Sequence, residues 1–378
     1  TGMLTIIGEE IDAAYNDMVL GLMVCPDVVR EVGSQLRIVY TPLHGSGNLP
    51  VRRALRDAGI THVKVVPEQE LPDPAFSTVR APNPEDPAAF DMAIPLARQA
   101  GATVILGTDP DCDRLGVCAM DSQGSFRTLS GNQIGCLLLH HILSARKAAG
   151  TLPENGAAVK SIVSTNLANA ICEDYGVTLY EVLTGFKYIG EKIQQFEDSG
   201  EHIFLFGFEE SYGYLSGTEV RDKDAVNAAV LVAEAACVCL KEGITLFDRL
   251  QQIYARYGYY DEMTWSGTYP GKEGAEQIKS IMARLHDETP GDIDGVKVLA
   301  KRDYLKGVET SKQGSAPLLF PPSDVVYFKL DRQFWTCVRP SGTEPKIKFY
   351  AGASHPGSLQ DAKEACAQLL EAFKQLAK

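Results

Sequence analysis

The residues best suited to chemistry are three aspartates at alternate positions with an arginine directly after them: Asp109, Asp111, Asp113 and Arg114. Pro110 disfavours a helix, so we expect an extended segment, in which alternate side chains share a face. Three carboxylates on one face can converge on a hard cation, and such oxygen ligands suit Mg²⁺. A guanidinium beside a metal is a good place for a phosphate. The segment therefore predicts a magnesium site with an adjoining phosphate site.

The same segment has two rival interpretations, an EF-hand calcium loop and an acidic surface turn. Spacing excludes the EF-hand: counted from Asp109, Arg114 stands where glycine is required and Met120 where glutamate is required. The surface turn stays open on the motif alone, but its setting weakens it. Residues 102–107 and 115–120 have the pattern of buried strands, and ligands of open α/β sheets bind at the carboxyl ends of strands.

Length and composition indicate a globular protein of two or three domains. The chain has 378 residues, 45% of them hydrophobic and 22% charged, which is too long for one ordinary core and typical of a soluble protein. It contains no apolar run long enough for a membrane-spanning helix. Nine cysteines without a C-x-x-C pair favour reduced thiols in a cytoplasmic protein over disulfides or a zinc site. A net charge of −13 argues against nucleic acid as a partner.

Strands and helices alternate through most of the chain. Strand patterns at 36–40, 62–66 and 103–107 are separated by helical patterns, which predicts a largely parallel sheet covered on both faces. The alternation recurs in a second set, which includes a predicted strand at 161–164. After about residue 258, strands follow strands, and this texture predicts an α+β domain with an antiparallel sheet.

A glycine-rich turn at residues 41–48 joins the first predicted strand to a helix. Such a turn can bind an anion at the helix N-terminus. It also resembles half of a dinucleotide fingerprint, but Pro50 stands in place of the third glycine. A turn that merely needs small residues is the simpler alternative. His44 is either catalytic or, as is more common, a hydrogen-bonded turn histidine.

The segment Thr184-Gly185-Phe186-Lys187 lies between a predicted strand and a predicted helix. A lysine at a helix start is unfavourable against the helix dipole, which prefers acids at that end. A bound phosphate would explain it, and an ordinary surface lysine is the alternative.

Residues 207–213 follow a buried strand and contain Glu209 and Ser211. Carboxylates in such a place can accept paired hydrogen bonds from vicinal sugar hydroxyls. Arg221 and Lys223 come shortly after and start a helix. They add positive charge to the predicted site, unless the run is only a charged helix cap.

Residues 339–346 follow a hairpin that we predict around residues 331–333, and they link two strands. An arginine, two hydroxyls and a glycine that admits backbone N–H groups make a phosphate cradle, with a plain hairpin turn as the alternative. A protein this acidic must gather positive charge locally to bind phosphates. The sequence offers six cations in these loops: Arg114, Lys187, Arg221, Lys223, Arg339 and Lys346.

Taken in order, the segments at 109–114, 207–213 and 339–345 resemble the α-D-phosphohexomutases, and those at 41–47 and 184–187 strengthen the match. The match is most similar to the bacterial phosphoglucomutase and phosphopentomutase-like branch. The resemblance implies two three-layer α/β/α domains with mixed, largely parallel sheets, followed by an α+β domain with an antiparallel sheet. Their expected bounds are 1–125, 126–257 and 258–378.

The resemblance also implies roles for particular residues. The three aspartates would bind Mg²⁺, and Arg114 would lie by the catalytic phosphate. Glu209 and Ser211 would hold sugar hydroxyls. The remaining substrate-binding residues would be Thr184, Gly185, Lys187, Arg221 and Lys223, together with Arg339, Ser341, Gly342 and Thr343, which would grip the phosphate that does not react. The implied reaction interconverts glucose 1-phosphate and glucose 6-phosphate, with glucose 1,6-bisphosphate as intermediate and activator.

One part of the family pattern is missing from the sequence, the phosphoserine loop of the first domain. Only residues 353–356 look similar, and we reject Ser354 as nucleophile because the segment follows the phosphate loop and should hold a helix cap at Ser354 or Ser358. We therefore expect domains two to four of a mutase, inactive without the first. The alternatives are a mannose or pentose phosphate substrate, or a sugar-phosphate-binding module without catalysis.

Overall fold

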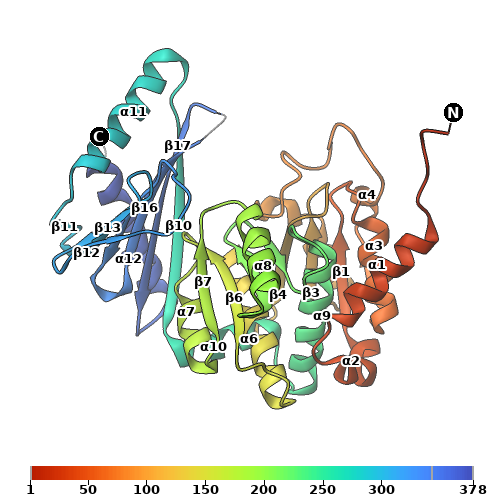
Figure 1. The fold of residues 1–378 in the computed structure, drawn as a ribbon. Helices are drawn as coiled ribbons and strands as arrows, with labels where there is room; N and C mark the ends of the chain where they lie inside the picture. The colour runs from red at the N-terminus through yellow and green to blue at the C-terminus, as the bar shows by residue number, and fades with distance from the viewer. Residues whose placement is uncertain (1, 342–343, 377–378) are drawn as a thin grey trace. The chain divides into compact units, whose positions relative to one another are not determined.

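The computed structural model describes residues 2–341 and 344–376 (Figure 1). Contacts within the chain divide it into two compact units. The first unit comprises residues 1–162 and 168–253, and the second comprises residues 163–167 and 254–378. Each unit has apolar core of its own.

The first unit begins with a five-stranded mixed sheet and the helices around it. Its elements are α1 (Glu9–Gly21), α2 (Pro26–Val32), η1 (Gly33–Gln35), β1 (Arg37–Thr41), α3 (Asn48–Ala58), β2 (His62–Val65), α4 (Pro67–Glu70), η2 (Pro87–Phe90), α5 (Ala93–Ala100), β3 (Val104–Thr108), β4 (Leu115–Met120) and β5 (Phe126–Thr128). The strand order is β2-β1-β3-β4-β5. β1 is parallel to β2 and β3, whereas β3, β4 and β5 pair antiparallel. Val39, Ile105 and Cys118 form a row across three strands that packs against α5.

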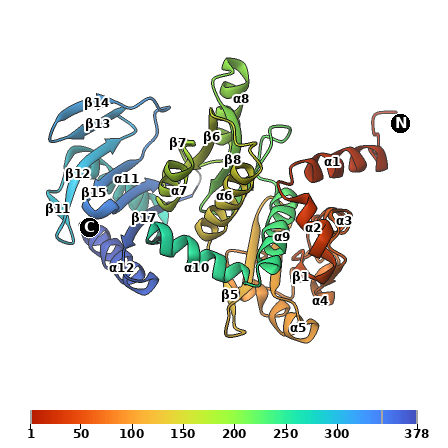
Figure 2. The same cartoon turned by 90° about the horizontal axis from the view of Figure 1, so that it is seen from below.

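A second, four-stranded sheet completes the first unit. Its elements are α6 (Gly131–Ala148), β6 (Gly156–Ser161), α7 (Leu167–Tyr175), β7 (Thr178–Val182), α8 (Lys187–Ser199), β8 (Ile203–Glu209), β9 (Gly213–Leu215) and α9 (Ala225–Lys241). The order is β7-β6-β8-β9, with only β9 antiparallel to its neighbour. Ile189, Ile193 and Phe196 of α8 pack against this sheet. Helix α9 contacts α2 and α3 on one side and α6 on the other (Figure 2).

The structure confirms the predicted mixed sheets but moves one strand. The strands expected at 36–40, 62–66 and 103–107 are β1, β2 and β3, with ends shifted by one residue. The strand expected at 161–164 is wrong, because the chain pairs at Gly156–Ser161 instead. Lys160 interrupts the apolar pattern there, yet it is fully buried and its Nζ lies 3.6 Å from a carboxylate oxygen of Glu181 on the neighbouring strand.

The second unit is built on an antiparallel sheet in the order β10-β17-β16-β15-β12-β13-β14, with β11 paired to β12. Its elements are β10 (Tyr259–Thr268), α11 (Gly271–Asp287), β11 (Asp292–Ile293), β12 (Val296–Asp303), β13 (Val308–Ser311), β14 (Gly314–Pro317), β15 (Val326–Leu330), η3 (Asp331–Gln333), β16 (Trp335–Pro340), β17 (Lys346–His355) and α12 (Leu359–Leu376), and α10 (Leu246–Tyr257) leads into it. Phe328, Val338 and Phe349 pack against α11 and α12 in one core. The expected antiparallel sheet and the hairpin around residues 331–333 are both confirmed.

Candidate metal and phosphate site

The three aspartates converge on one point after the end of β3. One carboxylate oxygen from each of Asp109, Asp111 and Asp113 lies within 4.8 Å of the others. The segment is a turn rather than the extended stretch that the sequence predicted: the Cys112 N–H donates to the Asp109 carbonyl at 3.0 Å, and Cys112 has a φ of 60°. A left-handed backbone conformation at a residue other than glycine is strained, and such strain often marks a functional loop. The turn, and not strand alternation, brings the carboxylates together.

The Asp109 side chain stabilises this turn by accepting backbone hydrogen bonds within it. Its side chain is buried, and its Oδ1 accepts the backbone N–H groups of Asp113 at 3.1 Å and Arg114 at 2.9 Å. Burial raises the pKa of the Asp109 carboxyl to about 7, opposed by the Arg114 N–H and reinforced by the charges of Asp113 and Asp111. Three like charges around partly buried oxygens disfavour one another, and a hard divalent cation would relieve this. The donor set therefore fits Mg²⁺.

Two cationic side chains border the triad. The Lys223 Nζ lies 3.0 Å from Asp113 Oδ2 and 2.9 Å from Asp222 Oδ1. Burial lowers the pKa of Lys223, but these two carboxylates outweigh it, so the pKa is raised overall. Arg114 lies beside the triad, as predicted, with its Nε 3.7 Å from Asp109 Oδ2. The site thus has a cluster of carboxylates suited to binding a metal ion, directly next to two cationic side chains suited to binding a phosphate.

The nearest partner of Arg114 is a residue that the sequence analysis missed, Glu85. The Arg114 Nη1 donates to Glu85 Oε1 at 2.5 Å. Glu85 stands in the long loop between α4 and η2, and no spacing in the sequence connects it to the acidic segment. Only the tertiary structure, in which this loop lies against β4, shows that Glu85 reaches Arg114.

The glycine-rich turn at 41–48 packs against the acidic turn and donates hydrogen bonds to it. Both the backbone N–H and the Oγ of Ser46 donate to the Pro110 carbonyl, at 2.8 and 3.0 Å. A Cβ added to Gly47 would lie 2.7 Å from the Cys112 Sγ, so this position has no room for a side chain. The contacts favour the interpretation in which the turn needs small residues.

His44 has the surroundings of a turn histidine rather than a catalytic one. Its Nδ1 is 2.8 Å from the Leu71 carbonyl oxygen, and its Nε2 is 2.7 Å from the Thr78 Oγ1. With both ring nitrogens engaged, His44 ties the 41–48 turn to the loop that follows α4.

The predicted sugar loop meets the acidic turn through the backbone. The Leu115 N–H donates to the Tyr212 carbonyl at 3.0 Å, and the Ala225 N–H donates to the Cys112 carbonyl at 3.2 Å. Arg114 and Gly213 form an isolated antiparallel bridge. The segments at 109–114, 207–213 and 221–225 are therefore neighbours within one compact unit.

The remaining predicted residues of the first unit are arranged around this junction. The buried Glu209 accepts the Gly185 N–H at 2.6 Å through its Oε1, which joins the 184–187 segment to the sugar loop; Thr184 and Ser211 are half-buried. Lys187 begins α8 and is exposed. Arg221 pairs with Glu197 of α8. Arg114, Arg221 and Lys223 each have a carboxylate partner, so the predicted positive field is partly neutralised by neighbouring carboxylates.

The predicted phosphate cradle lies in the second unit. The Arg339 Nε donates to the Tyr350 Oη at 3.1 Å, and the Ser341 N–H donates to the Lys346 carbonyl at 2.7 Å. Lys346 pairs with Glu344 at 3.0 Å. Gly342 and Thr343 lie outside the described residues. Ser358 caps α12 by accepting the Asp361 N–H at 3.1 Å, which confirms the predicted cap near that serine.

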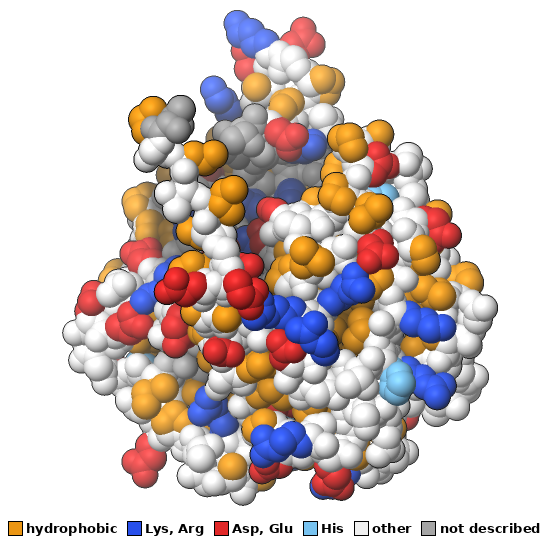
Figure 3. All heavy atoms as spheres, turned by 90° about the vertical axis from the view of Figure 1, so that its right-hand side faces the viewer, with side chains coloured by type: hydrophobic (Ala, Val, Ile, Leu, Met, Phe, Trp, Pro, Cys, Tyr) orange, Lys and Arg blue, Asp and Glu red, His pale blue; other side chains and the backbone are white. Residues whose placement is uncertain are grey.

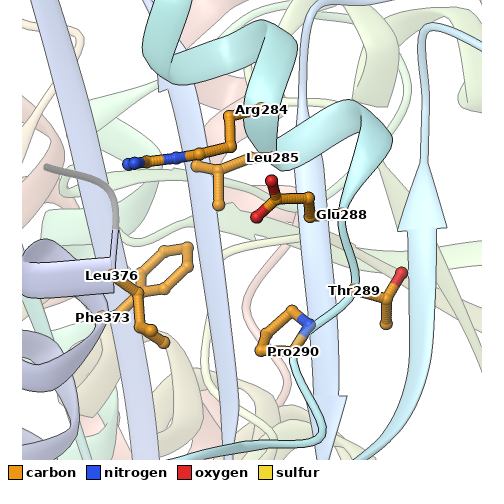
Figure 4. A pocket seen from close by; sticks show the side chains of 7 residues that line it. All are labelled: Arg284, Leu285, Glu288, Thr289, Pro290, Phe373 and Leu376. Carbon is orange, nitrogen blue, oxygen red and sulfur yellow. The ribbon is translucent and has the colours of Figure 1, made fainter.

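A cavity in the second unit shares no residue with any predicted site (Figure 4). Its volume is about 320 Å³, and it lies between the end of α11 and the end of α12. It is lined by Arg284, Leu285, Glu288, Thr289, Pro290, Phe373 and Leu376.

The surface and the thiols agree with the composition. Positive and negative side chains are interspersed on the face shown in Figure 3. In the part of the chain that the structure describes, no helix has the length and hydrophobicity needed to cross a bilayer. In the described part of the chain, no disulfide joins any of the cysteines.

Comparison with known families decides where the chain belongs. The model of the phosphoglucomutase/phosphomannomutase alpha/beta/alpha domain II matches residues 13–122, and that of domain III matches residues 130–257. The chain belongs to this family. The acidic turn lies inside the first match, and the sugar loop lies inside the second.

Individual relatives agree with this assignment. The chain is 39% identical over 325 residues to a phosphoglucomutase of Staphylococcus aureus strain MRSA252, covering 85% of this chain and 58% of the relative. A Staphylococcus epidermidis phosphoglucomutase is 39% identical over 323 residues, with the same coverage. The chain therefore spans little more than half the length of these relatives.

Solved structures share the fold. The exocytosis-sensitive phosphoprotein parafusin, a phosphoglucomutase of Paramecium in its open form, superposes with a TM-score of 0.66 at 16% identity, over 97% of this chain and 61% of that one. N-acetylphosphoglucosamine mutase of Aspergillus fumigatus in complex with glucose 1,6-bisphosphate superposes with a TM-score of 0.52 at 13% identity, over 98% of this chain and 66% of that one.

Proposed function

We propose that the chain carries the metal, sugar and phosphate sites of a Mg²⁺-dependent phosphohexomutase that interconverts glucose 1-phosphate and glucose 6-phosphate. The observation that carries this proposal is the acidic triad beside Arg114, joined by backbone hydrogen bonds to the sugar loop. The phosphoglucomutase relatives support glucose as the sugar. The expected domain bounds (1–125, 126–257 and 258–378) and a cytoplasmic location belong to the same proposal.

The triad would hold the metal. Asp109, Asp111 and Asp113 supply the carboxylate oxygens, and the ion, when bound, would neutralise charge on the phosphoryl oxygens. Arg114 and Lys223 would bind the same phosphate from the side, because a guanidinium and an ammonium can both donate to its oxygens. In doing so they would exchange their present carboxylate partners for the phosphate.

Glu209 and Ser211 would orient the sugar ring. A carboxylate has about four lone-pair sites, so Glu209 can keep the Gly185 N–H and still accept from a sugar hydroxyl. Thr184, Gly185, Lys187 and Arg221 would complete the substrate site of the first unit. In the second unit, the phosphate that does not react would be held by Arg339, Ser341, Gly342 and Thr343.

The phosphoryl relay would come from outside this chain. In the family it passes through a phosphoserine of a first domain, and the relatives extend well beyond the part that this chain spans. Glucose 1,6-bisphosphate would be the intermediate and activator, which the glucose 1,6-bisphosphate complex of the Aspergillus fumigatus mutase supports by analogy of fold. We expect the 378 residues to bind sugar phosphate weakly and to show no mutase turnover.

Calorimetric titration tests the proposal. Glucose 1-phosphate and glucose 1,6-bisphosphate are titrated with Mg²⁺ into the chain and into Asp111→Asn and Arg339→Ala variants. We expect Asp111→Asn to weaken Mg²⁺ binding and Arg339→Ala to weaken sugar-phosphate binding without changing that of Mg²⁺. Sugar-phosphate affinity that is unchanged in Arg339→Ala would contradict the phosphate cradle.

Two further assays decide between related functions. Turnover of the full-length parent on glucose, mannose and pentose 1-phosphates separates the mutase specificities. Mutase turnover by the isolated chain would contradict the need for a phosphoserine in another domain. Binding by the chain together with an inactive full-length parent would indicate a non-catalytic sugar-phosphate-binding module.

A further inference from the structure

Arg114 is held beside the acidic triad and not upon it. Its Nη1 is 2.5 Å from Glu85 Oε1, whereas its Nε is 3.7 Å from both Asp109 Oδ2 and Asp113 Oδ1. A separation of 3.7 Å is beyond the range of a hydrogen bond. The guanidinium of Arg114 therefore makes its short contact with Glu85. The Lys223 Nζ already contacts Asp113 Oδ2 at 3.0 Å, so Arg114 is the neighbouring cation that stays off the aspartate oxygens.

The position of Glu85 is fixed by its own loop. The Glu85 N–H donates to the Asn83 Oδ1 at 3.0 Å, and the Asp86 N–H donates to the Asn83 carbonyl at 3.0 Å. Pro84 lies so close to β4 that a Cβ added to Gly116 would be 2.8 Å from the Pro84 carbonyl oxygen. Arg114 immediately precedes β4, so the strand that follows Arg114 also sets the place of Glu85.

The ion pair contributes little to stability by itself. The Arg114 and Glu85 side chains are 36% and 35% exposed, and ion pairs this exposed contribute little to the free energy of unfolding. Its effect is better sought in the geometry of the site, where an unrestrained guanidinium would be drawn to the nearest carboxylates.

We propose that Glu85 is a positioning residue, which holds the guanidinium of Arg114 off the three aspartates and so keeps their oxygens accessible to Mg²⁺. The inference rests on the metal role proposed above and adds a residue to it. Without the Glu85 charge, Arg114 closes onto Asp109 and Asp113 and competes with the ion for the same oxygens. Glu85 then acts on metal binding through Arg114 alone.

Mg²⁺ titration into the whole 378-residue chain, followed by calorimetry, tests this. We expect Glu85→Gln to weaken Mg²⁺ affinity about tenfold, the scale of one charge-assisted hydrogen bond that the guanidinium would form with an aspartate in competition with the ion. The matched control is Glu68→Gln, which removes the same charge from an exposed position on α4, and we expect its affinity to stay within about twofold of the unaltered chain. Thermal unfolding of both variants should match that of the unaltered chain, which separates positioning from a folding defect.

A second background isolates the route through Arg114. In an Arg114→Ala chain the guanidinium is gone, so adding Glu85→Gln should change Mg²⁺ affinity by no more than about twofold. Equal affinities of the Glu85→Gln and unaltered chains would overturn the proposal, as would an undiminished tenfold loss in the Arg114→Ala background.

The same titrations distinguish this inference from the proposed function. If Asp111→Asn abolishes Mg²⁺ binding and Glu85→Gln does not weaken it, only the positioning role falls. If the unaltered chain does not bind Mg²⁺, or Asp111→Asn binds it equally well, the metal role falls and the inference falls with it.

Discussion

Replacing Asp261 by asparagine should change how the stability of the second unit depends on pH. Asp261 lies on β10, opposite Ala353 of β17, on a strand that packs beneath α12. Burial raises the pKa of its carboxyl to about 6, with partial opposition from Lys363. Asparagine has the same shape without the charge, so the variant removes the titration and little else.

The sign and size follow from linkage. In the unfolded chain Asp261 ionises near its ordinary pKa of 3.8, whereas the folded chain keeps the proton until about pH 6. Because the folded state binds more protons in that window, the free energy of unfolding falls as pH rises from about 4 to about 6. A pKa raised from 3.8 to about 6 corresponds to about 3 kcal/mol at 1.36 kcal/mol per pH unit. We expect Asp261→Asn to be more stable than the unaltered chain by about 1–3 kcal/mol at pH 8 and equal to it near pH 4.

Tryptophan fluorescence gives a direct assay. The chain has two tryptophans, Trp265 and Trp335, and both lie in the second unit. Urea unfolding followed by their emission at several pH values yields the free energy of unfolding of that unit. The control is Asp294→Asn, which removes the same charge from an exposed turn. Parallel stability curves for Asp261→Asn and the unaltered chain would refute the reasoning.

Three further variants test other contacts. Gly47→Ala places a Cβ 2.7 Å from the Cys112 Sγ, and we expect a loss of about 1–3 kcal/mol in unfolding free energy, with weaker Mg²⁺ binding; unchanged melting and Mg²⁺ affinity would show that the turn yields freely. Glu234→Ala leaves His141 and the Cys25 N–H without their buried acceptor, which should destabilise the first unit by about 3–5 kcal/mol in thermal unfolding; a loss below about 1 kcal/mol would contradict that estimate. Arg339→Ala should weaken glucose 1,6-bisphosphate binding by about 1.5–3 kcal/mol in calorimetry, and an equal loss of Mg²⁺ affinity would argue against separate phosphate and metal sites.

The acidic turn shows how a carboxylate cluster can be predicted correctly from a wrong local conformation. Alternation of Asp109, Asp111 and Asp113 led to the right cluster, although Cys112 adopts a left-handed conformation and the segment is a turn. The prediction succeeded because three carboxylates within five residues can reach one point in either conformation. In contrast, the strand expected at 161–164 was misplaced, because the pattern gives no warning that a charge such as Lys160 is buried.

The sequence by itself determined the family and the order of the α/β and α+β regions along the chain. It also determined which residues of the acidic turn and the sugar loop are candidates for binding. These depend on local spacing and periodicity, which a single strand, turn or helix expresses without its neighbours. Only the tertiary structure decided that Glu85 and Lys223 reach the acidic turn, that Leu115 bonds to Tyr212, and that Asp261 is half-buried. Such contacts join residues far apart in the chain, so they depend on the order of strands in the sheets and on which helix covers which face. Burial, and with it the raised pKa of Asp109 and of Asp261, is set by that packing rather than by the sequence pattern.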